Sequence, residues 1–348
     1  MTNPQTRPDL PHATGGRRIR WDEVPGEVRS AIGRLLGSEV VGAVSQPGGF
    51  SEGVAARLRL ADGGRAFVKA ASSLVAPGVA GFHRREIEIS ARLPSGVPAP
   101  RLLDAYDDGV WVALVFEEID GALPAQPWRR DEFDRVLAAT VDLARVLTPS
   151  PIDATKLGPP RLGGWHALAG EDGGGKPGGE GGIGELGALA GGGGADGPAQ
   201  WVAGHLDELI MLEREAAATL TGETLLHGDL YPFNLMLTPE RVFVVDWPHA
   251  WVGPAYCDVL TLLSSASLSG LDPQPYVKEH PLTRGLDPEP INVFLAMHAG
   301  FLLRLAATAG TAADRHLVDM AAALGGASLR WLRQRLRAIP TSSRQMSG

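Results

Sequence analysis

The stretch LLHGDLYPFNLMLTPERVFVVDWPHA, residues 225–250, sets polar side chains between apolar runs that otherwise have the composition of buried strands. Its first polar turn carries His227, Asp229 and Asn234, and the last apolar run ends in Asp246. A proline inside the turn interrupts regular structure, so Asp229 and Asn234 share a tight turn. The apolar runs that follow predict a hairpin, whose second strand returns Asp246 to the side of Asn234.

This pattern has a chemical interpretation. An amide oxygen beside a carboxylate oxygen suits Mg²⁺, which predicts metal binding by Asn234 and Asp246. Asp229 is not needed as a ligand and can orient a hydroxyl group and accept its proton. Such a set performs phosphoryl transfer from ATP. The alternative is that the three residues only form a turn and end a strand. Their joint spacing favours the catalytic interpretation.

The segments HGDLYPFNLML and VFVVDW resemble the aminoglycoside phosphotransferase and choline kinase superfamily, which shares the protein-kinase-like fold. The resemblance covers roughly residues 40–310 and is most specific in the catalytic segment. Trp247 follows Asp246 where protein kinases have Phe-Gly, a common departure in this superfamily. The resemblance implies an α+β, two-lobed fold with a small antiparallel-sheet N-lobe, a larger helical C-lobe and ATP in the cleft. It makes Asp229 the catalytic residue and Asn234 and Asp246 the Mg²⁺ ligands.

The N-terminal half offers the other residues that such kinases need, a lysine on the third strand and a glutamate on the next helix. FVKA supplies Lys69, which alone would be interpreted as a solvated strand-end lysine, and HRREIEISARL supplies Glu86 and Glu88. Glu86 fits the family register better and would hold Lys69 against the α- and β-phosphates. By position, QPGGFSEGVAARL resembles the nucleotide-covering loop, with Ser51 donating to the β-phosphate. ALVFEEIDG resembles the interlobe hinge, where backbone groups around Glu118 would meet adenine.

Other residues near the motif are assigned supporting roles. The resemblance implies that His227 braces the catalytic loop and that Asp258 caps backbone N–H groups of the same region. Cys257 is expected to be a small buried residue. The aromatic and histidine side chains that follow the metal-binding residue are Trp247, His249, Trp251 and Tyr256. They form either a substrate wall or packing between the lobes, and packing is favoured.

The chain-wide pattern predicts an N-lobe over residues 19–120 and a C-lobe over 121–340. Short β-rich runs separated by glycine turns, with one helix among them, are typical of an antiparallel sheet. The helices are expected at 24–37, 82–93, 131–147, 201–220, 254–268, 289–308 and 312–337. Disorder is expected in the tails, 1–18 and 341–348, and in the Gly-rich insertion 170–197, because these segments lack apolar residues to bury.

Composition excludes several classes of protein. With 32 basic against 40 acidic residues, the net charge of −8 argues against a nucleic-acid partner. The single cysteine permits no intramolecular disulfide. The first residues lack the apolar core of a signal peptide, and no apolar run of about 18 residues predicts a membrane span. A cytoplasmic protein is expected, and the oligomeric state stays open.

The acceptor is expected to be a small-molecule hydroxyl: aminoglycosides, choline, amino sugars, macrolides and amino-acid alcohols all stay open, as does ATP against GTP. In such enzymes acidic C-lobe residues commonly meet ammonium groups. Those that the C-terminal half offers are Asp272, Glu279, Asp287, Glu289, Asp314 and Asp319. None stands in a recognisable motif. A protein acceptor is disfavoured, because helix signals resume at about residue 254 and leave little room for an activation segment.

Two rival functions remain. One is a catalytically inactive, nucleotide-binding regulatory pseudokinase, which usually lacks the base, a metal ligand or the lysine. All four positions are filled here, by Lys69, Asp229, Asn234 and Asp246. The other is a purely structural helical protein, which would make the ordered polar set at 227–246 accidental. Both are disfavoured on these grounds.

Overall fold

The computed structural model describes residues 18–46, 52–170, 198–309 and 315–338. The predictions of disordered tails and of a flexible Gly-rich insertion lie outside the described residues, except at Arg18 and Gly170. Ser51, the predicted phosphate donor, also lies outside them.

The N-terminal part is a five-stranded antiparallel sheet with the order β1-β2-β3-β5-β4. Its strands are β1 (Val40–Ser45), β2 (Val54–Leu60), β3 (Arg65–Ser72), β4 (Leu102–Asp107) and β5 (Trp111–Glu117). Residues 112–116 of β5 are all buried, since a central strand is covered on both faces. The predicted antiparallel sheet is confirmed, including the turn after Leu60, where Gly63 has a φ of 87°.

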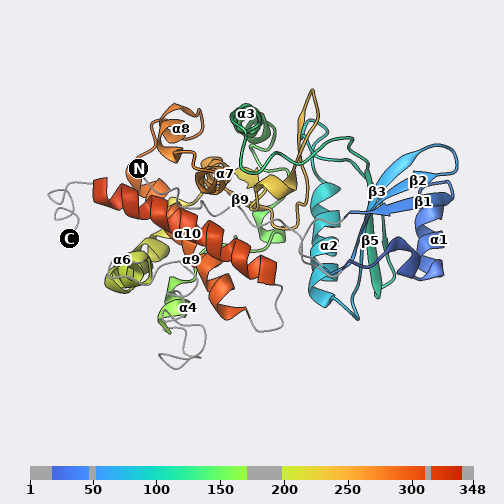
Figure 1. The fold of residues 1–348 in the computed structure, drawn as a ribbon, viewed down its shortest axis with the longest axis horizontal. Coiled ribbons are helices and arrows are strands. Elements are labelled where there is room, and N and C mark those ends of the chain that lie inside the picture. The colour runs from blue at the N-terminus through green and yellow to red at the C-terminus, as the bar shows by residue number, and fades with distance from the viewer. Residues whose placement is uncertain (1–17, 47–51, 171–197, 310–314, 339–348) are drawn as a thin grey trace, which may run out of the picture.

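Two helices cover opposite faces of this sheet (Figure 1). Helix α1 (Gly26–Leu35) packs Val28 and Ile32 against the face that carries Val68 and Val115. Helix α2 (Pro77–Ser90) packs on the other face and lies on the side that faces the helical lobe. It begins five residues before the prediction, because Pro77 occupies its first turn, where a missing N–H costs nothing.

The rest of the chain is mainly helical, which confirms the predicted α+β, two-lobed arrangement (Figure 1). The helices are α3 (Arg130–Val146), α4 (Trp165–Ala169), α6 (Pro198–Thr219), α7 (Tyr256–Leu268), α8 (Pro273–Glu279), α9 (Pro288–Thr308) and α10 (Arg315–Ala338). The sequence did not predict α4 and α8. Both are too short to show a clear apolar period.

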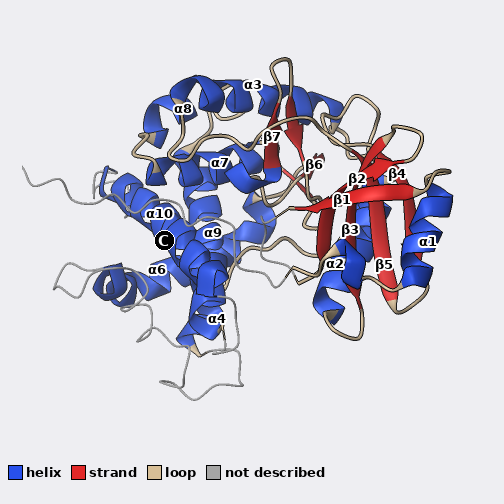
Figure 2. Cartoon of the chain, turned by 45° about the vertical axis from the view of Figure 1, so that its right-hand side comes forward, coloured by secondary structure: helices blue, strands red, loops and turns tan. Residues whose placement is uncertain are grey.

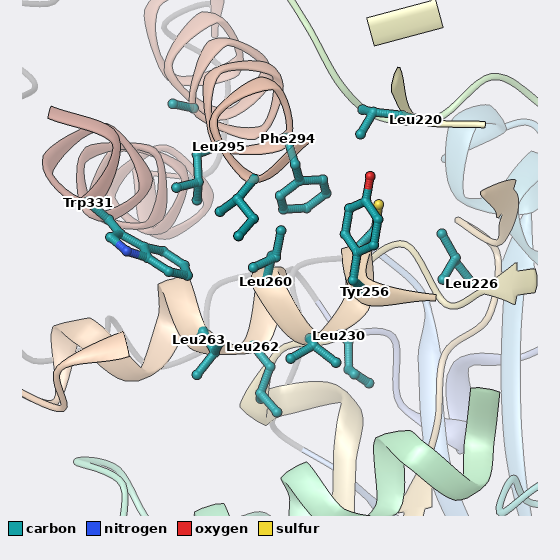
Figure 3. Packing of buried hydrophobic residues seen from close by; sticks show 14 of the residues in the cluster. Leu220, Leu226, Leu230, Tyr256, Leu260, Leu262, Leu263, Phe294, Leu295 and Trp331 are labelled. Atoms are coloured by element: carbon teal, nitrogen blue, oxygen red, sulfur yellow. The ribbon is translucent and has the colours of Figure 1, made fainter. Parts of the chain in front are cut away.

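The core of this lobe lies between α7, α9 and α10. Figure 3 shows Leu260 of α7 beside Phe294 and Leu295 of α9, with Trp331 of α10 closing the same cluster. Helix α9 is apolar on all sides because it is enclosed by its neighbours. By length and composition it could cross a membrane, contrary to the sequence-based expectation, but 78% of its most apolar window is buried inside the protein.

Four short strands carry the motif segment. β7 (Leu235–Leu237) and β8 (Val242–Val244) form the predicted hairpin. β6 (Thr224–Leu226) pairs instead with β9 (Trp251–Gly253), a strand that the sequence did not predict. Figure 2 shows these strands, in red, between the helices and the large sheet. The polar turn therefore lies at the junction of the two lobes.

Candidate active site

The turn that the sequence predicts to be catalytic, residues 227–234, begins after β6 ends, and we call it the catalytic loop. Gly228 has a φ of 76°, and a Cβ there would lie 2.4 Å from the carbonyl oxygen of His249, so only glycine fits between His227 and Asp229. The Asn234 side chain, at the end of a 3₁₀ turn (Pro232–Asn234), donates through Nδ2 to the Asp229 carbonyl at 2.8 Å and to Oδ2 at 2.9 Å. These bonds fix the Asp229 carboxylate and leave the Asn234 Oδ1 oxygen for a cation.

The β7–β8 hairpin brings the predicted metal-binding segment back to this loop. The Val245 N–H donates to the Asn234 carbonyl at 2.9 Å, which sets Asp246 next to the turn as the sequence predicted. Among the residues that the structure describes, Asp246 is the one non-glycine residue with positive φ, at 69°. Such a conformation costs energy and is concentrated at functional sites. It aims a half-exposed carboxylate into the space between the lobes.

Lys69 of β3 joins the two lobes electrostatically. Its Nζ lies 2.8 Å from Glu86 Oε1 on α2 and 3.0 Å from Asp246 Oδ1. Lys69 therefore pairs with Glu86, as the sequence predicted, and the Glu86 side chain is buried. Glu88, the other candidate on this helix, is not among the side chains that line the space between the lobes.

The pKa values of this trio follow from burial and from one ammonium shared by two carboxylates. Burial raises the pKa of Glu86 to about 7, against the attraction of Lys69. Partial loss of hydration in the cleft opposes ionisation of Asp246, but the Lys69 ammonium outweighs it and lowers that pKa to about 2. Burial would lower the pKa of Lys69, yet the charges of Asp246 and Glu86 raise it. Lys69 and Asp246 are therefore charged at neutral pH.

Two buried residues support the loop. His227 Nε2 donates to the Val245 carbonyl at 3.0 Å and links the catalytic loop to the metal-binding segment. Asp258, in the first turn of α7, accepts from the His227 N–H at 2.8 Å and from the Gly228 N–H at 3.0 Å. These contacts match the bracing that the resemblance implied. Cys257 beside Asp258 is buried, as expected.

The hinge segment follows β5. The carboxylate of Glu118 pairs with Arg57 at 3.2 Å and with Arg65 at 2.5 Å, so its side chain ties the hinge to the sheet. Glu118, whose backbone the sequence assigned to adenine binding, lines the same cleft as Lys69. Ala122 then pairs with Leu237, which connects the hinge to β7.

A cleft of about 960 Å³ separates the lobes and collects the predicted residues. Lys69, Glu86, Asp229, Asn234 and Asp246 all line it. The sequence favoured packing between the lobes for the aromatic residues after Asp246, but they lie mainly in the hydrophobic core, and Trp247 also lines the cleft. Trp247, Trp251 and Tyr256 are buried in the C-lobe core.

His249 lines the cleft and makes an edge contact with Phe82 of α2, at 4.9 Å between ring centroids. Burial lowers its pKa to about 4, so it is neutral at pH 7.

Sequence reasoning missed several cleft residues. Arg161, in a Pro- and Gly-rich loop before α4, has its Nη1 3.8 Å from Asp229 Oδ1. His298 of α9 and His83 of α2 also line the cleft. Burial lowers the pKa of each histidine to about 3. Arg161 carried no periodic or motif signal, and the histidines were indistinguishable from core residues of an apolar helix face.

The residues present fit a magnesium ion that is shared with a substrate. Within the described ranges, no group of three or more His, Cys, Asp and Glu side chains could hold a metal by itself. Mg²⁺ commonly takes one or two protein carboxylates and completes its shell with water and phosphate oxygens. Asn234 and Asp246 match that donor set. The ion's remaining ligands would come from a nucleotide.

Comparison with known proteins gives a consistent picture. The model of the phosphotransferase enzyme family matches residues 48–277. Among curated proteins, the LicA homolog of Mycoplasma capricolum is 27% identical over 64 residues, which span 18% of this chain and 27% of that protein. This match therefore covers only a small part of either protein.

Solved structures share the fold at low sequence identity. A thermostable mutant of an aminoglycoside phosphotransferase, in a ternary complex with AMP-PNP and hygromycin B, has a TM-score of 0.54 and 13% identity, over 88% of this chain and 99% of that one. A choline/ethanolamine kinase family protein from Mesorhizobium loti has a TM-score of 0.50 and 16% identity, over 91% and 96%. The family model covers well over half of the sequence, and the chain belongs to the phosphotransferase enzyme family.

Proposed function

We propose that this protein is an ATP- and Mg²⁺-dependent phosphotransferase that moves the γ-phosphoryl group to a hydroxyl of a small molecule. One observation carries the proposal: Asp229 and Asn234 of one turn, Asp246 after β8 and Lys69 of β3, which come from three separate segments, line one cleft. Solved structures of an aminoglycoside phosphotransferase with a similar fold are ternary complexes of AMP-PNP or ADP with hygromycin B. A reaction that uses ATP is consistent with a cytoplasmic location, which is part of this proposal.

Each residue has a defined task in this scheme. Asp229 accepts the proton of the acceptor hydroxyl as the new O–P bond forms and the bond to the β-phosphate oxygen breaks, which releases ADP. Lys69, held by Glu86, contacts the α- and β-phosphates. Asn234 and Asp246 hold the Mg²⁺, which neutralises charge on the phosphates. The protein contributes mainly positioning and fixed charge.

The test is mass spectrometry of a mixed acceptor panel incubated with the protein and Mg²⁺-ATP. The panel holds aminoglycosides, macrolides, choline, amino sugars and hydroxy amino acids. We expect one compound class to gain a single phosphoryl group with the wild type and none with Asp229→Ala. Asp142→Asn, an exposed change on α3 outside the cleft, is the matched control and should react normally.

The rival is a regulatory pseudokinase that binds nucleotide without turnover. It predicts Mg²⁺-ATP binding with no phosphorylated product and no ADP release across the panel. No observation at the site favours it, since the base, the metal ligands and the lysine face the same cleft. Equal product formation by the wild type and Asp229→Ala would contradict the proposed mechanism.

A further inference from the structure

The proposed function does not identify the acceptor. The side chains at the far end of the cleft restrict the chemical classes of acceptor that would bind there. We propose that the acceptor is an alcohol with an apolar body and no positive charge near the reacting hydroxyl, rather than a polycationic aminoglycoside. This inference rests on the proposed function, because it assumes that Asp229 faces the acceptor. It concerns the part of the cleft beyond Asp229, between the catalytic loop, α9 and α10.

The first support is the lining of that part, which we call the apolar wall. It consists of Phe233, Phe301, Leu302, Leu305, Leu317 and Met320. These side chains belong to one hydrophobic cluster, in which α9 and α10 pack together. Leu302 and Met320 are almost fully buried, whereas both phenylalanines and both remaining leucines keep part of their surface accessible. Such a lining binds apolar surface and gives little to a sugar covered with ammonium groups.

The second support is that the polar side chains in this region are satisfied internally. Tyr231 donates its hydroxyl to His298 Nε2 at 2.7 Å, and His298 Nδ1 donates to Ser328 Oγ at 2.8 Å. Ser328 in turn donates to the Leu324 carbonyl at 3.2 Å. Burial lowers the pKa of His298 to about 3, so the chain of hydrogen bonds is neutral at pH 7. Tyr231 and His298 therefore present ring surface rather than charge to the cleft.

The third support is Arg161, whose guanidinium lies 4.9 Å from the Phe301 ring centroid and 3.8 Å from Asp229. The segment that follows it is firmly attached. The Gly163 N–H donates to the Met297 carbonyl at 2.8 Å, and the Glu213 carboxylate accepts from three successive N–H groups at the start of α4. A positive charge is thus built in beside Asp229, the residue that faces the acceptor in the proposed function.

Apart from Asp229, no acidic side chain of the described catalytic loop, α9 or α10 lines the cleft near Arg161. On the catalytic loop, α9 and α10, the one carboxylate among the described cleft residues is Asp229 itself, already beside Arg161. The acidic residues considered for ammonium recognition do not line the cleft: Asp272, Glu279, Asp287, Glu289 and Asp319. Asp314 lies outside the described residues. Like charges brought close in a low-dielectric site repel strongly, so this end selects against cations.

The test uses three probes on one biphenylmethanol scaffold: the neutral alcohol, its carboxylate derivative and its trimethylammonium derivative. Binding of each is measured by calorimetry with Mg²⁺-AMP-PNP present, and kanamycin is a fourth probe. We expect the neutral and carboxylate probes to bind at least about tenfold more tightly than the ammonium probe and kanamycin. In the Arg161→Glu variant, the ammonium probe should bind more tightly than the carboxylate probe. Arg145→Glu is the control for net charge, because Arg145 is exposed and outside the cleft.

The outcomes separate this inference from the proposed function. Tighter binding of kanamycin or of the ammonium probe to the wild type would overturn the inference, even if phosphoryl transfer is then observed. So would an unchanged order in Arg161→Glu, or failure of every probe to bind while Mg²⁺-AMP-PNP binds normally. Loss of Mg²⁺-dependent AMP-PNP binding itself would instead contradict the proposed function.

Discussion

The two ends of the cleft differ in the charge of the side chains that line them. At one end Lys69, Glu86 and Asp246 form a charged cluster that joins the lobes, with N–O distances of 2.8 and 3.0 Å. At the other end the apolar wall and the neutral Tyr231–His298–Ser328 chain carry almost no charge, apart from Arg161. Asp229 lies between them. In the proposed function the charged end would hold the phosphates and the metal, whereas the apolar end would select the acceptor.

This difference explains what the sequence reveals. Phosphate and metal chemistry needs particular residues at fixed spacings, so Asp229, Asn234 and Asp246 could be recognised from one short segment. An apolar wall can be built from many residues, and Phe301 or Leu317 are indistinguishable in the sequence from ordinary core positions. The reaction class is therefore predictable from the sequence, but the acceptor is not.

The largest predicted effect on kcat is at Asp229, which lies between the two ends of the cleft. Asp229→Asn keeps the size of the side chain but removes the base, and we expect kcat to fall by about 10²–10⁴-fold. The KM for ATP should change little, because Lys69 and Asp246 are untouched. Steady-state ADP release with the identified acceptor measures both constants. Near-normal kcat would mean that Asp229 is not the base.

Next in size is a change at the charged end alone. Asp246→Asn removes one metal ligand and one partner of Lys69, and we expect kcat to fall by about 10²–10³-fold. Unlike Asp229→Asn, it should also weaken Mg²⁺-dependent binding of AMP-PNP, as calorimetry with and without Mg²⁺ would show. Identical nucleotide binding by the variant and the wild type would place the metal elsewhere.

A smaller effect is expected beneath the catalytic loop. Asp258→Ala leaves the His227 and Gly228 N–H groups without their buried acceptor, at a cost of about 1–3 kcal/mol in the free energy of unfolding. Urea denaturation measures this loss. Asp142→Ala, an exposed change on α3, should cost little in the same assay. Equal stability of the two variants would contradict the bracing role.

Because His298 at the apolar end is neutral in the folded protein, we expect the free energy of unfolding to change with pH by about 2 kcal/mol. The folded-state pKa of His298, about 3, lies below its ordinary value of 6.5, so its contribution to stability is present above pH 6.5 and is lost as the pH falls toward 3. Between pH 7.5 and 5.0 the wild type should lose about 2 kcal/mol more than His298→Gln, which cannot titrate. Urea denaturation at both pH values checks this. Parallel losses would mean that His298 is protonated in the folded protein.

The long elements of the fold could also be predicted from the sequence, whereas some of the short elements could not. The sheet and the long helices follow from alternation and helical period, and α1, α3, α9 and α10 lie close to their predicted ranges. The pairing of β6 with β9 was not predictable, because three-residue strands carry no period of their own and depend on tertiary contacts. Arg161 was missed for a related reason: its place beside Asp229 is set by contacts of its loop with α6 and α9, far away in the sequence.

A crystal structure with Mg²⁺ and AMP-PNP would test directly whether the cleft binds nucleotide as proposed. We expect Mg²⁺ between Asn234, Asp246 and the phosphates, with Lys69 on the α- and β-phosphates. We also expect the γ-phosphate to point toward Asp229 and the apolar wall. A nucleotide bound outside this cleft, or a metal held without Asp246, would contradict this proposal.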